Sequence, residues 1–61
     1  MNFPSTPQQA HSAGVMDREI GNDVPGLTLE DFCREIEDTE QAEMCAAAYK
    51  DGFEGRPLGE K

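Results

Sequence analysis

Cys33 and Cys45 are the two residues of this chain whose type and spacing point most directly to a chemical role. If the chain turns near residue 39 between two antiparallel helices, both thiols lie at the same level on facing sides. Such a placement allows either a disulfide or a pair of reduced thiols that pack as small apolar groups. Residues 1–14 carry no Lys or Arg and no long apolar stretch, so we expect no secretory signal, a cytoplasmic protein and reduced cysteines.

Other catalytic and metal-binding patterns do not appear in the sequence. Structural zinc sites take four ligands and use closely spaced cysteine pairs, whereas eleven residues separate the two cysteines here. The single histidine, His11, lies in the N-terminal segment, and Ser5 and Ser12 have no evident base. Phosphate-binding, dinucleotide-binding, calcium-loop and zinc-protease motifs are missing. We therefore predict no metal, no cofactor, no catalytic residue and no enzymatic activity.

Carboxylates form the second group of candidate functional residues. The 61 residues include 13 acids and 5 bases, for a formal net charge of −8. Such a chain repels nucleic acids and anionic lipids and is attracted to basic protein surfaces, so we predict no direct nucleic-acid or membrane binding. Within residues 30–43, Arg34 is the only base beside Glu30, Asp31, Glu35, Glu37, Asp38, Glu40 and Glu43. These acids either imitate a phosphate backbone or are simply solvated charges that favour helix N-termini.

Two helices must position these residues. Thr28 is a predicted N-cap with Asp31 at capping-box spacing, and a second cap at Asp38 or Thr39 starts a new helix. Gly52 is the predicted end of that helix, with Lys50 in its last turn. The first helix has the apolar stripe Leu29, Phe32, Cys33 and Ile36; the second has Ala42, Cys45, Ala46 and Tyr49.

The predicted fold is therefore all-α, a small antiparallel two-helix hairpin with helices at about 28–38 and 39–52. One bent helix over 29–51 is the alternative. The hairpin domain spans 27–56, between a flexible N-terminal arm (1–26) and a flexible C-terminal tail (57–61). The arm is rich in Pro, Ser, Gln and Ala, and only a short turn near residues 16–20 is expected to be helical. So small a core predicts dimerisation or ordering on a partner.

Tyr49 and Phe53 are one helical turn apart and are candidates either for contact with a partner or for closing the hairpin core. The pattern Tyr-x-x-Gly-x-x-Gly-Arg over 49–56 resembles a segment of ribosome modulation factor and of short bacteriophage and prophage reading frames. Ribosome modulation factor is basic and this chain is acidic. The resemblance therefore implies only a small bacterial or phage accessory protein and transfers no residue roles.

These features predict a small acidic protein-binding modulator, for example a phage-encoded inhibitor that occupies the basic, nucleic-acid-binding surface of a larger host protein. The alternatives are a structural or assembly subunit that forms homodimers, a ribosome-associated factor, and an antitoxin-like chain that folds on its toxin.

Overall fold

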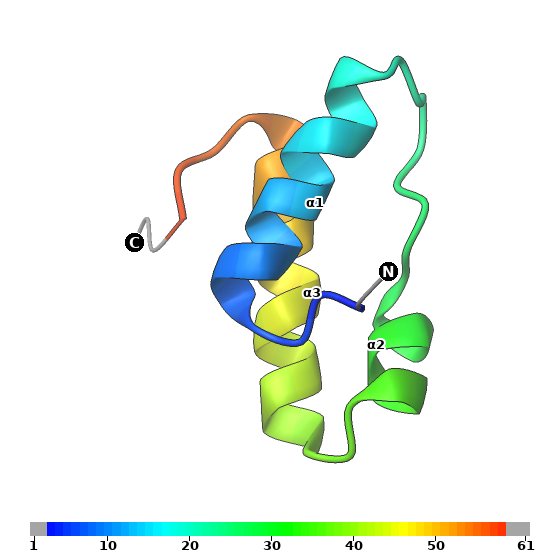
Figure 1. Ribbon diagram of the computed structural model, residues 1–61, viewed down its shortest axis with the longest axis vertical. Coiled ribbons are helices and arrows are strands. Elements are labelled where there is room, and N and C mark those ends of the chain that lie inside the picture. Colours follow the sequence, from blue (N-terminus) through cyan, green and yellow to red (C-terminus); the bar gives the residue numbers. More distant parts are fainter. Residues whose placement is uncertain (1–2, 59–61) are drawn as a thin grey trace.

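The computed structural model describes residues 3–58, which form three helices and no strand. The helices are α1 (Pro7–Glu19), α2 (Leu29–Glu35) and α3 (Thr39–Glu54) (Figure 1). The all-α fold class is confirmed for these residues. Of the predicted C-terminal tail, residues 59–61 lie outside the described part of the chain, as do residues 1–2 of the predicted arm.

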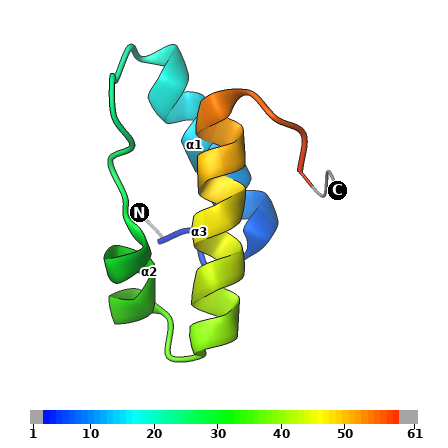
Figure 2. The same ribbon diagram turned by 180° about the vertical axis from the view of Figure 1, so that it is seen from behind.

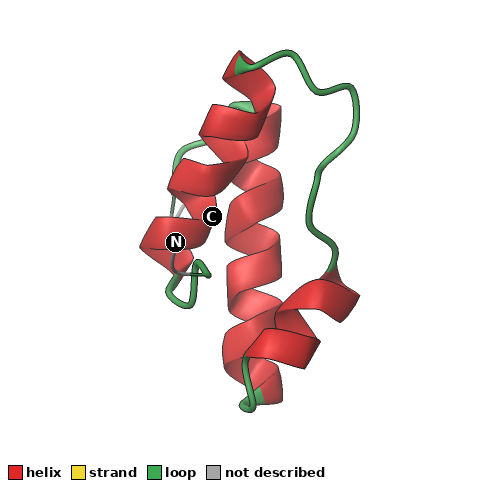
Figure 3. Ribbon diagram, turned by 45° about the vertical axis from the view of Figure 1, so that its right-hand side comes forward, coloured by secondary structure: helices red, strands yellow, loops and turns green. Residues whose placement is uncertain are grey.

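α1 and α3 lie side by side and run in the same direction (Figures 1 and 2). Near their starts, the Gln41 side chain donates to the backbone oxygen of Ser5 at 3.1 Å. Near their ends, the Arg18 guanidinium lies beside Gly55. Because parallel helices need a long connection, residues 20–28 return along the length of the molecule before α2 begins (Figure 3).

The prediction of a flexible arm is wrong over residues 7–19, where α1 forms. Its N-terminus carries signals typical of a helix start: the Thr6 side chain accepts from the backbone N–H of Gln9 at 3.2 Å, and Pro7 occupies the first turn. The Gln9 side chain in turn accepts from the Ser5 N–H. This Thr-Pro-x-Gln sequence is the local evidence that a composition argument overlooks.

Two glycines bring α1 and α3 into backbone contact. A Cβ at Gly14 would overlap the backbone oxygen of Tyr49, and a Cβ at Gly52 would overlap that of His11. Gly52 therefore lies inside α3, and the prediction that it ends this helix is wrong. The helix continues to Glu54 and ends at Gly55, which adopts the left-handed conformation with φ 82°. Lys50 consequently lies outside the last turn.

The break between α2 and α3 is confirmed, and the single bent helix is excluded. The Asp38 carboxylate accepts from the N–H groups of Glu40 at 2.9 Å and Gln41 at 3.3 Å, which caps α3. The hairpin is wrong in its detail, however. α2 has only seven residues and lies aslant the first turns of α3, whose main packing partner is α1 (Figure 3).

Three aromatic rings and several small residues make the core. Phe32 is fully buried between Phe3 and Tyr49, with ring centroids 5.2 and 5.8 Å away. The other buried apolar residues are Ala10, Ala42, Cys45 and Ala48. From the predicted stripe of the first helix, only Phe32 is buried and Ile36 is half-buried, while Leu29 and Cys33 are exposed. Phe3, in the predicted arm, thus completes the core.

Candidate functional site

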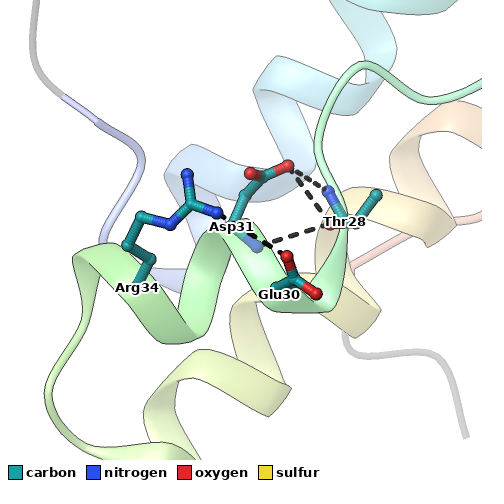
Figure 4. A network of polar contacts seen from close by, with 4 residues as sticks. All are labelled: Thr28, Glu30, Asp31 and Arg34. Atoms are coloured by element: carbon teal, nitrogen blue, oxygen red, sulfur yellow. Dashed lines mark hydrogen bonds and ion pairs between the residues drawn. The ribbon is translucent and has the colours of Figure 1, made fainter.

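The seven acids of residues 30–43 lie on α2, on the joint after it and on the first turns of α3, at the lower end of the molecule in Figure 1. We call this surface the acidic end; it comprises Glu30, Asp31, Glu35, Glu37, Asp38, Glu40 and Glu43. All are exposed except Asp31, which is half-buried. Its one cation, Arg34, pairs with Glu30 at 3.6 Å (Figure 4).

Two members of the acidic end hold helix starts in place. Asp31 closes the capping box of α2: its carboxylate accepts from the Thr28 N–H at 3.0 Å, and the Thr28 hydroxyl accepts from the Asp31 N–H at 3.3 Å (Figure 4). Asp38 caps α3 with its side-chain carboxylate, which accepts hydrogen bonds from backbone N–H groups of the first turn. The interpretation of these acids as charges that favour helix N-termini therefore holds for Asp31 and Asp38, and also for Glu30 and Glu40, which lie in the first turns of α2 and α3.

Three acids of this surface, Glu35, Glu37 and Glu43, neither cap a helix nor lie in a first turn. Among the described residues, no ion pair involves Glu35, Glu37, Glu40 or Glu43. The other described cations, Arg18, Lys50 and Arg56, come from the last turn of α1, from the second half of α3 and from the segment after it. Charge is therefore unevenly distributed, with the acidic end left almost without counter-charge.

An apolar groove has a volume of about 770 Å³. One of its walls is formed by α3, and the other by α2 together with residues 20–28, which we call the return segment. Its α3 wall includes Ala46, Ala47 and Phe53, which lie on one helical face. Val24, 71% exposed, and Leu29, 48% exposed, are on the opposite wall. The sequence analysis did not identify this groove, because it arises from the return of the chain and not from any local motif.

The two candidate aromatic residues have different places. Tyr49 is 2% exposed, and its hydroxyl donates to the Asp17 carboxylate and accepts from the Gly26 N–H at 2.9 Å. Tyr49 is thus a core residue that also holds the return segment, and it is not available to a partner. Phe53 is half-buried and lines the groove, so it can still touch one.

The cysteines are not brought together. Cys33 is exposed and Cys45 is buried, and both are free thiols. A disulfide between the two cysteines and a packed pair of thiols are therefore both wrong as predictions, because each needs Cys33 to face the core. Phe32 faces the core instead, and the next residue of a helix points about 100° away from it. Cys45 does pack in the core, and its burial raises the pKa of its thiol.

We expect the two thiols to react at very different rates. An aromatic disulfide reagent at pH 7.5 should label one thiol per chain, on Cys33, at the rate of a free peptide thiol, and label Cys45 at least about a hundredfold more slowly, because exposure controls access. Because burial disfavours the Cys45 thiolate, the folded chain should keep its full stability below the ordinary thiol pKa of about 8.5 and lose part of it as the pH rises toward the raised folded-state pKa. Mass spectrometry of tryptic peptides assigns the sites. Equal labelling of both thiols would contradict the burial of Cys45.

His11 has a structural partner. Its Nε2 donates to the backbone oxygen of Arg56 at 2.6 Å, and this bond ties the segment after α3 to α1. Across residues 3–58, no group of three or more His, Cys, Asp or Glu side chains is arranged to hold a metal ion. The helices of that same range are also too short or too polar to cross a bilayer.

Comparison of the chain with protein-family models, curated proteins and solved structures finds no significant match. Three residues of the motif that resembles ribosome modulation factor have structural roles in this fold. Tyr49 is in the core, Gly52 contacts α1 and Gly55 ends α3.

Proposed function

We propose that this protein is a small binding protein that attaches through its acidic end to the basic surface of a larger protein and modulates it. The observation that carries this proposal is the asymmetry of charge. Most exposed carboxylates without an ion pair lie at the acidic end, while three of the four described cations lie elsewhere. A surface of this kind speeds encounter with a positive patch and selects against negative partners.

The acidic end also suits competition with a nucleic acid. Carboxylates displayed on α2 and α3 meet the same Lys and Arg side chains that neutralise phosphates. We therefore propose that the partner is a nucleic-acid-binding protein of the cell in which this chain is made, with a phage or prophage origin as one source of such an inhibitor. Its place of action would be the cytoplasm, where the exposed Cys33 thiol stays reduced.

Charge reversal at the acidic end should abolish capture of the partner. The variant E35K/E37K avoids the capping acids, and E19K/D23K makes the same change among exposed residues at the opposite end of the molecule (Figure 1). Each replacement adds two units of charge, so both double variants have the same net charge. Immobilised wild-type protein and both variants are exposed to lysate of the producing cell, and retained proteins are quantified by mass spectrometry.

The partner is then the protein that wild type and E19K/D23K retain and E35K/E37K does not. With that protein purified, we expect E35K/E37K to weaken binding at least about tenfold at low salt and less at high salt. Nucleic acid should compete with the wild type for it. Equal retention by all three chains would contradict the proposal, and binding by E35K/E37K equal to that of wild type would remove the role of the acidic end.

Self-association is the strongest alternative, because apolar groove residues such as Val24 and Leu29 are exposed. Two copies with a formal net charge of −8 each repel one another, which favours a partner of opposite charge. Ribosome association and antitoxin-like folding on a toxin are further forms of binding to a basic partner, and the identity of the captured protein distinguishes them.

A further inference from the structure

The geometry points to a second contact with the same partner: the apolar groove beside α3 binds an amphipathic helix whose basic end lies over Glu43. This inference rests on the proposed function and names the part of the partner that the protein recognises. It goes beyond charge attraction, because it requires a defined apolar pattern in the partner.

The shape of the groove favours a helix. Along α3 its wall runs from Glu43 to Glu54, which at 1.5 Å per residue is about 16 Å, or three helical turns. Between these two residues the wall includes Lys50 and also Ala46 and Ala47, whose small side chains leave room for the larger apolar side chains of an occupant. Residues 3–58 offer no strand edge to which an extended peptide could add, so binding relies on side chains, as in helix-in-groove recognition.

The charges at the two ends of the groove differ. Glu43, at one end, belongs to the acidic end of the molecule and has no ion-pair partner among residues 3–58. At the other end Glu54 already pairs with Arg56 at 3.5 Å, and Lys50 lies one turn before it. A cationic end of the occupant is therefore favoured over Glu43, where the groove is continuous with the acidic end. This complementarity argues against a second copy of the same acidic chain.

A designed peptide provides the test. The probe is a fluorescein-labelled peptide of about 15 residues, with Leu at helical spacing i, i+3, i+4 and i+7 and with lysines at one end. Two control peptides have the same leucines with glutamates in place of the lysines, or the same composition in scrambled order. Binding is followed by fluorescence anisotropy to the full chain. A small apolar dye is measured in parallel.

Variants of the groove make the test specific. Ala47→Arg places a long cationic side chain in the groove at an exposed helical position, and Met44→Arg, 56% exposed on α3 and not part of the groove wall, is its control. We expect the basic peptide to bind wild type and M44R, and to bind A47R at least about tenfold more weakly. Glu43→Gln should weaken it about threefold and Glu19→Gln should not.

Three results would overturn the inference: equal binding of the basic peptide to A47R and M44R, equal binding of the scrambled or acid-ended peptide, or binding of the dye without any peptide. The lysate experiment separates this inference from the proposed function. If E35K/E37K loses the captured protein and A47R retains it, the groove inference fails and the proposed function stands. If all variants retain the same proteins, the proposed function itself fails.

Discussion

Replacement of Gly52 by Ala should destabilise the fold by at least about 2 kcal/mol, although alanine is the better helix former. Inside a helix, Ala is favoured over Gly by about 1 kcal/mol. Here the added methyl group would overlap the backbone oxygen of His11 on α1. Backbone atoms of two packed helices cannot rotate away as a flexible side chain can, so α1 must move off α3, and overpacking against backbone on this scale costs about 3 kcal/mol or more. The overlap therefore outweighs the gain in helix propensity.

The measurement is thermal and urea unfolding followed by circular dichroism, in which a loss of 2 kcal/mol lowers the Tm by about 8–16 °C. Ala47→Gly is the matched control, because Ala47 is exposed in the same helix and its change costs only about 1 kcal/mol of propensity. Gly14→Ala should resemble G52A, since a Cβ at Gly14 would overlap the backbone oxygen of Tyr49. A Tm of G52A above that of wild type would show that α1 does not pack on α3.

This dependence on glycine explains why the sequence predicted one half of the fold better than the other. Thr28 was recognised as a cap and Asp38 as one of two candidates for the next one, because a cap is a contact between residues two or three positions apart. α1 binds α3 through a side of the helix that is marked by small residues, Ala10 and Gly14, and not by large apolar ones. A search for apolar periodicity does not detect such a surface, so the N-terminal segment was taken for a flexible arm.

The candidate site divides in the same way. The exposure of Glu35, Glu37 and Glu40 follows from local patterns, because the inward side of each helix was set by Phe32 and by Ala42. The groove required the three-dimensional path of the chain. The parallel arrangement of α1 and α3 forces residues 20–28 to run back past α3, and the Tyr49 hydroxyl holds that segment through Gly26. The two walls of the groove come from separate parts of the sequence, so no local pattern predicts it.

Replacement of Phe32 by Ala should leave the chain largely unfolded at room temperature. Phe32 is fully buried and contacts the rings of Phe3 and Tyr49, so it joins the N-terminal segment, α2 and α3. Removal of a buried Phe side chain costs about 3–5 kcal/mol. In a chain of only 61 residues the core rarely supplies more than about 3–5 kcal/mol of stability. One substitution can therefore remove most of it.

The comparison that isolates this effect is Leu29→Ala on the same helix, because Leu29 is 48% exposed and its truncation should cost less than about 1 kcal/mol. Phe32→Leu keeps most of the apolar volume and should lie between the two. Urea unfolding followed by circular dichroism gives the order, with F32A lowest. If F32A were as stable as L29A, α2 would not be anchored by this ring, and neither the groove wall that α2 forms nor the display of the acidic end would be held in place. The fold and the proposed binding surface thus depend on the same side chain. We therefore expect F32A to lose both its stability and its ability to capture the partner.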